Sequence, residues 1–199
     1  MSHQLLFAFV IFAIAMFFTP GPNNIMVLSS GLTYGFRRTM PHILGITFGF
    51  AFMVGAVGFG FGAVFLAFPV LQTILKYAGA AYLVYLAAAI AMSGPPKPGD
   101  AGRGPMTFFG AAMFQWVNVK GWVMVIGTIT AYAAIAAFPW NIAIQTALSL
   151  GMGIVSTSIW TLFGSALRPV LTSPIAVRAF NIVMAILLLA SLIPVFVEA

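Results

Sequence analysis

The chain has 199 residues, of which 62% are hydrophobic and 5% are charged. Soluble domains carry about 25% charged residues, so this composition excludes an ordinary soluble domain and predicts an integral membrane protein. The net charge of +6 comes from only eight scattered Lys and Arg, which excludes a nucleic-acid-binding surface, and the chain has no Cys for thiolate chemistry.

Six apolar segments can be marked off along the chain, and each is long enough for a helix to span a bilayer. In chain order they cover residues 5–33, 39–67, 70–92, 106–137, 141–167 and 175–197. Such lengths favour helices over the alternating strands of a barrel, so the predicted fold class is an all-α membrane protein with six transmembrane helices. A five-span alternative, with the termini on opposite sides, stays open because the first and fourth segments are long.

A polar linker at 93–105 divides this single transmembrane domain, residues 1–199, into halves at 1–92 and 106–199. Three spans in each half predict two inverted three-helix repeats, because an odd number of crossings reverses the second half. The first segment is interrupted at Pro20–Pro22 and the fourth near 118–121. Helices one and four are therefore predicted to be discontinuous, which is typical of a transporter site near the bilayer midplane.

Positive charges predict the orientation in the membrane. Three of the predicted loops carry pairs of basic residues: Arg37 with Arg38, Lys97 with Arg103, and Arg168 with Arg178. These loops are expected in the cytoplasm, which places both termini in the periplasm. Lys76, near the outer start of the third segment, is the exception.

The first interruption holds the candidate site residues Pro20, Gly21, Pro22, Asn23 and Asn24. Two prolines remove backbone donors and end the first half-helix, about 15 residues or about 22 Å into the segment. The second half-helix would begin at the asparagines, and its free N–H groups would favour a carboxylate. An ordinary loop or a packing kink is the alternative.

Lys120 is the only charge between Gly104 and Leu167, and with Gln115 and Asn118 it forms the second group of candidate site residues. An ammonium in hydrocarbon is costly and usually marks a binding or transport site, although a lysine can also snorkel to the headgroups. On an unbroken helix Lys120 would point about 160° away from Asn118. A break beside Gly121 would let amide and ammonium converge on one substrate carboxylate.

Weaker candidates lie in the last two segments, where Ser156, Ser158 and Asn181 could line a transport path. Hydroxyl groups that satisfy backbone carbonyls are the alternative role. His42 is expected at the surface, at the cytoplasmic entrance of the second segment, where it could titrate near neutrality.

The only carboxylates, Asp100 and Glu198, fall in the linker and at the C-terminus. A cationic cargo would lack a counter-ion in the membrane, so the predicted cargo is a small zwitterion or anion. An intramembrane enzyme is rejected, because no embedded acid, thiol or His cluster supplies a nucleophile with a base. A metal site and a cofactor are not expected, and the predicted partners are an amino-acid substrate and the lipid bilayer.

Four motifs carry a resemblance that spans essentially the whole chain: Thr19-Pro-Gly-Pro-Asn-Asn-Ile25, Gly35-Phe-Arg37, Ala78-Gly-Ala-Ala-Tyr-Leu83 and Gln115-x-x-Asn118-x-Lys120. With them the chain resembles the LysE/RhtB family of amino-acid exporters, and most of all its cysteine and O-acetylserine branch. Many relatives have Pro where this chain has Val119, and many carry acidic residues near the first motif or in helix five.

The resemblance implies efflux of small neutral amino acids from the cytoplasm across a bacterial inner membrane, with a homodimer as the assembly. Homoserine, threonine, leucine or a related small zwitterion are the alternative cargoes. The energy source stays open among proton antiport, substrate exchange and facilitated diffusion.

Overall fold

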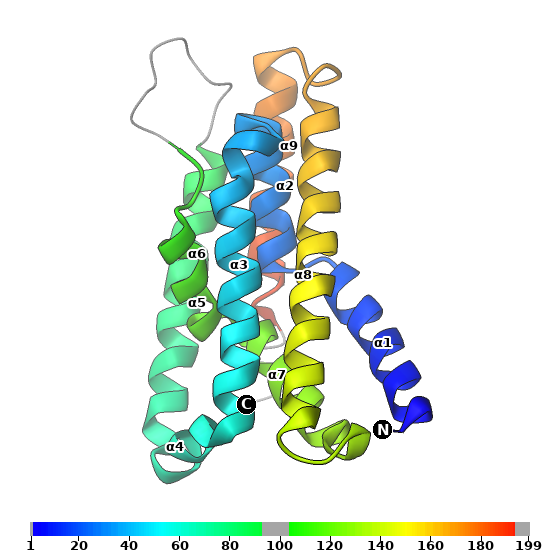
Figure 1. The fold of residues 1–199 in the computed structure, drawn as a ribbon. Coiled ribbons are helices and arrows are strands. Elements are labelled where there is room, and N and C mark those ends of the chain that lie inside the picture. The colour runs from blue at the N-terminus through cyan, green and yellow to red at the C-terminus, as the bar shows by residue number, and fades with distance from the viewer. Residues whose placement is uncertain (1, 93–103, 194–199) are drawn as a thin grey trace.

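A computed structural model describes residues 2–92 and 104–193, which form a helical bundle without a strand among them, as Figure 1 shows. The all-α prediction is confirmed for these residues. The α-helices are α1 (His3–Phe18), α2 (Pro22–Tyr34), α3 (Phe36–Ala56), α4 (Gly62–Ala67), α5 (Pro69–Ala91), α6 (Phe108–Phe114), α7 (Val119–Ala131), α8 (Trp140–Leu167) and α9 (Pro174–Ala190). Short helical turns lie at η1 (Val57–Phe61), η2 (Gln115–Val117) and η3 (Ala133–Ile135).

Both predicted interruptions are present. The axes of α1 and α2 differ by 52°, with the break at Thr19 to Gly21 between them. The second break lies slightly earlier than predicted, at η2 and Asn118, whose backbone is extended (φ −82°, ψ 101°). Lys120 and Gly121 already belong to α7, so the change of direction comes just before the lysine.

Three helical stretches are long and apolar enough to cross a membrane by themselves: Phe36–Val64, Thr73–Ala91 and Trp140–Leu167. A fourth results if α1 and α2 count as one bent span. The remaining apolar helices, Phe108–Val117, Val119–Ala131 and Pro174–Ala190, are shorter. A membrane protein is thus confirmed, whereas six spans and inverted halves stay predictions.

The half-helices divide the bundle into two levels along its long axis (Figure 1). In that view α2 and α6 occupy the upper half, α1 and α7 occupy the lower half, and the long helices α3, α5 and α8 run past both. The two breaks therefore lie near mid-height. At the lower end α1 leans away from the other helices.

Glycines allow the upper half to pack closely. A methyl group at Gly164 of α8 would lie only 3.0 Å from the carbonyl carbon of Leu28 in α2, and one at Gly45 of α3 would lie 2.9 Å from that of Phe108 in α6. Backbones that approach so closely leave room only for hydrogen at these positions.

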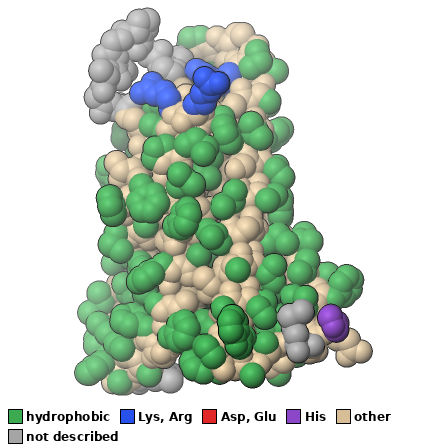
Figure 2. Space-filling view, in the orientation of Figure 1, with side chains coloured by type: hydrophobic (Ala, Val, Ile, Leu, Met, Phe, Trp, Pro, Cys, Tyr) green, Lys and Arg blue, Asp and Glu red, His purple; other side chains and the backbone are tan. Residues whose placement is uncertain are grey.

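The basic side chains visible in Figure 2 gather at the upper end. Arg37 and Arg38 begin α3, and Arg168 caps α8 beside Gly35, whose positive φ of 81° turns the chain from α2 into α3. We call this end the arginine end. Lys97 and Arg103, and most of the predicted 93–105 linker, lie outside the described residues, as do Asp100 and Glu198. The cytoplasmic position of the arginine end stays a prediction.

The expectation that His42 lies at the surface is wrong, because its side chain is only 2% exposed. Its helix, α3, packs against α2, α6 and α8. Thr39 and Ile46, three residues before and four after His42, share its face of the helix and are also buried. Position 42 therefore faces the bundle interior.

Candidate functional site

The end of α1 exposes backbone carbonyls at mid-height that have no partner within the helix. Side chains from three other elements satisfy them. Asn24 Nδ2 donates to the carbonyls of Phe17 and Thr19, at 2.8 and 3.0 Å, and Ser156 Oγ of α8 donates to that of Phe17 at 2.7 Å. The ammonium of Lys120 donates to the carbonyl of Thr19 at 2.7 Å.

A pair of amides joins the two broken helices directly. Asn23 Nδ2 donates to Gln115 Oε1 at 2.8 Å, and Gln115 Nε2 donates in return to Asn23 Oδ1 at 3.2 Å and to the carbonyl of Ala111 at 2.9 Å. Gln115 is fully buried and lines neither of the cavities described below. It therefore supports the geometry of the breaks instead of facing a cargo.

Lys120 lies against the first break and not against lipid. A methyl group at Gly21 would come within 2.8 Å of Lys120 Cδ and 3.0 Å of Lys120 Nζ, so the lysine stem crosses the site where Gly21 has no side chain. The carbonyl end of α1 carries partial negative charge, which compensates a cation where the described residues offer no carboxylate. This contact explains how an ammonium is held at mid-height without an acidic partner.

A small cavity of about 30 Å³ lies on one side of Lys120. Its polar lining includes the side chains of Asn23, Asn24 and Asn118 together with Thr47 and Thr157. Apolar side chains complete the wall, notably Met16, Phe17, Ile46, Phe50 and Met124. This volume suits one or two water molecules and is too small for an amino acid, so the chamber must widen to admit a cargo.

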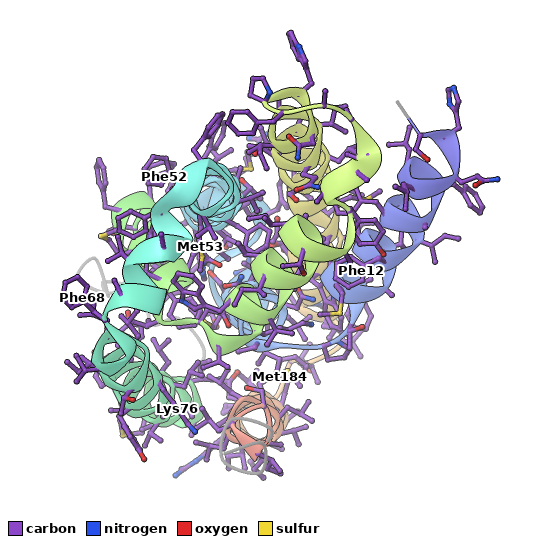
Figure 3. The ribbon with its side chains drawn as sticks, turned by 90° about the horizontal axis from the view of Figure 1, so that it is seen from below. Phe12, Phe52, Met53, Phe68, Lys76 and Met184 are labelled. Carbon is purple, nitrogen blue, oxygen red and sulfur yellow. The ribbon has the colours of Figure 1, made fainter. Side chains whose placement is uncertain are left out.

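A much larger cavity of about 940 Å³ lies on the other side of Lys120, toward the lower end of the bundle. Most of its wall is apolar and comes from α5, α7 and the residues around both breaks. Figure 3 looks along the axis from this end, with Lys76 on α5 and Met184 on α9 to one side of α7 and Phe12 on α1 to the other. The cavity is large enough to receive a small solute.

Five residues line both cavities: Met16, Gly21, Pro22, Asn118 and Lys120. They form the partition between the two spaces. Asn118 Oδ1 is buried and has no hydrogen-bond partner, so it is an acceptor available to a donor that enters the site. The partition thus offers a cation and a vacant acceptor, contributed by the two residues on either side of Val119.

The structure places some of the predicted site residues at the two cavities and others away from them. Gly21, Pro22, Asn23, Asn24, Asn118 and Lys120 line the small cavity, and Pro20 lines the larger one. Among the predicted path residues, Ser156 supports the end of α1, whereas Ser158 and Asn181 line neither cavity. Which of these residues bind a substrate stays a prediction.

Sequence reasoning missed the α3 wall of the small cavity, above all Ile46, Thr47 and Phe50. Buried Thr47 lies opposite Gly153, where a methyl group would come within 3.2 Å of Thr47 Cγ2. A lone threonine in an apolar helix has no local pattern that separates a cavity wall from ordinary packing. Only the crossing of α3 and α8 reveals its position.

Comparison with known proteins adds an independent line of evidence. The family model described as LysE type translocator matches residues 14–193. Proteins of Escherichia coli strain K12, E. coli O139:H28 and Shigella sonnei, each named cysteine/O-acetylserine efflux protein, are 31% identical to the chain over 202 residues. These alignments cover 98% of the chain and the full length of each relative. No solved structure matches the chain.

Proposed function

The chain belongs to the LysE type translocator family, and from that premise we propose that it is a secondary transporter that exports small neutral amino acids. Cysteine and O-acetylserine are the leading cargoes, because the relatives that match over the full length carry those names. In this proposal the protein crosses an inner membrane six times, as two inverted three-helix halves. The termini lie in the periplasm, and two copies form a homodimer.

One observation carries the proposal: the Lys120 ammonium and the unpartnered Asn118 Oδ1 line the same partition between two cavities. An amino acid carries a carboxylate and an ammonium on one carbon. Lys120 Nζ, with the free N–H groups at the start of α2, would bind the carboxylate. Asn118 Oδ1 would accept a hydrogen bond from the ammonium.

Transport would follow from exposing this partition to each side in turn. In the described conformation the larger cavity leads from the partition toward the lower end, while the tight packing around Gly31, Gly45 and Gly164 closes the arginine end. With that end in the cytoplasm, this is the conformation that releases cargo. The uptake conformation would require α2 and α8, or α3 and α6, to separate at the arginine end.

Purified full-length protein in proteoliposomes tests the proposal. Vesicles loaded with labelled O-acetylserine, cysteine, serine, homoserine, threonine, leucine or lysine should release the small neutral amino acids and retain lysine. Competition by cysteamine, which is cysteine without its carboxylate, should be at least about tenfold weaker than competition by cysteine, since tenfold corresponds to about 1.4 kcal/mol. Failure of every amino acid to move would overturn the function, and equal competition would overturn carboxylate recognition.

A matched pair of substitutions separates cargo recognition from folding. Asn118→Leu should weaken transport, while Asn141→Leu, at an asparagine of α8 that lines neither cavity, should leave the affinity for cargo unchanged. Equal loss of affinity in both variants would remove Asn118 from the cargo site.

A further inference from the structure

His42 is the one imidazole inside the described bundle, and the cargo site does not use it. Both of its ring nitrogens are buried without a hydrogen-bond partner. A neutral imidazole has one N–H donor and one lone-pair acceptor, and buried polar atoms of this kind normally find partners. An ionisable residue inside a membrane domain is costly and commonly serves a proton or ion path.

The position of His42 places it between the cargo site and the arginine end. Helix α3 starts at the arginine end, and His42 follows Arg38 by four residues. Ile46, one turn further along, lines the small cavity, so the imidazole lies about 6 Å along the helix axis from the cavity wall. On the other side, Thr39 Oγ1 and Ser30 Oγ are hydrogen-bonded at 3.0 Å, linking α3 to α2.

This level of the bundle is an apolar plug, which we call the arginine-end seal. It consists of buried Val27, Ile43, Ile46 and Ala111, packed with Phe36, Met106 and Trp160. The seal closes the space between the small cavity and the arginine end in the described conformation. His42 lies within its span on α3.

No counter-ion faces His42 from the helices packed against α3. Of these, α2 has Tyr34 as its only ionisable residue, at its last position, and α6 and α8 have none. Helix α3 itself adds Arg37 and Arg38, Arg168 caps α8, and Lys120 lies at the partition. All of these residues except the tyrosine are cations. A charged imidazole would therefore be unpaired in the closed seal, and an unpaired buried charge is strongly destabilising.

We propose that His42 is the proton-binding site that couples amino-acid export to proton entry, and that binding of a proton opens the arginine-end seal. This inference rests on the proposed export function. After cargo leaves, water enters from the small cavity past Ile46, and a hydronium ion in that water gives its proton to the lone pair of a His42 ring nitrogen. The imidazolium favours a hydrated seal, so the seal opens toward the arginine end. The proton then passes to water on that side, cargo binds, and the neutral imidazole allows the seal to close.

The two directions of movement are linked because the seal of the empty protein opens only after His42 is protonated, whereas with cargo bound the seal opens and closes around a neutral His42. Cargo and proton therefore cross in opposite directions, one per cycle. No group of the protein other than the imidazole changes its bonds, and the proton taken from hydronium on one side is returned to water on the other.

Two measurements on the same proteoliposomes test the coupling. Exchange of labelled O-acetylserine at equal internal and external pH reports the cargo path alone, and a pH-sensitive dye in the lumen reports proton movement when cargo is added outside. His42→Gln keeps a polar side chain of similar size but cannot titrate. It should retain exchange within about threefold of wild type while cargo-driven proton movement falls at least about tenfold. His3→Gln, at the exposed start of α1, should match wild type in both.

The outcomes separate the two proposals. If wild type exchanges no amino acid, export itself fails and the coupling fails with it. Exchange without cargo-driven proton movement in wild type would overturn the coupling alone, as would proton movement at the wild-type rate in His42→Gln.

A third measurement covers the case in which His42→Gln does not fold. In the His3→Gln protein, His42 is the only histidine of the chain. Its imidazole ¹⁵N signals in proteoliposomes should shift toward the protonated form as the buffer is acidified, and back when saturating O-acetylserine is added. A signal that remains neutral under all of these conditions would show a packing residue and overturn the proposal.

Discussion

Replacing Lys120 with Met is the sharpest test of the site. Methionine keeps an unbranched side chain over Gly21 but removes the ammonium that donates to the Thr19 carbonyl at 2.7 Å. A hydrogen bond from a charged group contributes about 1.5–3 kcal/mol. The substitution also removes the desolvation penalty of an ammonium inside the bundle, which offsets the lost hydrogen bond. The free energy of unfolding should therefore change by less than about 1 kcal/mol.

Transport should respond far more strongly than stability. A cargo carboxylate that enters the site without Lys120 loses its charged partner, and breaking a buried pair in this way costs about 3–5 kcal/mol. At about 1.4 kcal/mol per factor of ten, transport efficiency should fall at least about 100-fold.

The assay is the initial rate of labelled O-acetylserine export at several concentrations from proteoliposomes, normalised to the protein recovered in the membrane. Arg178→Met is the control, because this exposed basic residue of α9 lines neither cavity, and its efficiency should stay within about threefold of wild type. An Lys120→Met protein that exports with an efficiency within about threefold of wild type would refute the placement of the cargo carboxylate at Lys120.

Three further experiments test the framework around the site. Gly21→Ala should displace the Lys120 stem, because the added methyl would lie 2.8 Å from Lys120 Cδ; since this stem is flexible and can move, we expect reduced export with a change of less than about 1 kcal/mol in the free energy of unfolding. Gly151→Ala, where nothing lies within 4 Å of the added methyl, should leave export unchanged and be neutral or stabilising by up to about 1 kcal/mol, and an equal loss of export in both would argue against the close approach. Asn23→Ala and Gln115→Leu should show a coupling of at least about 1 kcal/mol in a double-mutant cycle of unfolding, since each removes the same amide pair; additive effects would mean that the pair does not join the two breaks. Gly164→Ala should lower the free energy of unfolding in detergent by about 1–3 kcal/mol, because its methyl would lie 3.0 Å from the Leu28 carbonyl carbon. An unchanged free energy of unfolding would contradict the tight crossing of α2 and α8.

The local features of the site could be predicted from the sequence because they depend on neighbouring residues. Proline lacks an N–H and ends a helix wherever it occurs, so the break before Pro22 required no knowledge of the fold. The composition predicted the membrane environment, and an isolated lysine in an apolar run identified Lys120 as exceptional. The second break was predicted at 118–121, whereas the structure has it at η2 and Asn118. The prediction relied on Gly121, and no residue type marked the extended backbone of Asn118.

Only the tertiary structure decided which groups meet. Asn23 bonds to Gln115 across 92 residues, and Lys120 bonds to Thr19 across 101, and no local pattern encodes such pairs. His42 was expected at the surface because it stands at the entrance of the second apolar segment, yet the packing of α2, α6 and α8 around α3 buries it. Backbone breaks are set by the conformational limits of a few adjacent residues, whereas burial and long-range contacts depend on how whole helices cross.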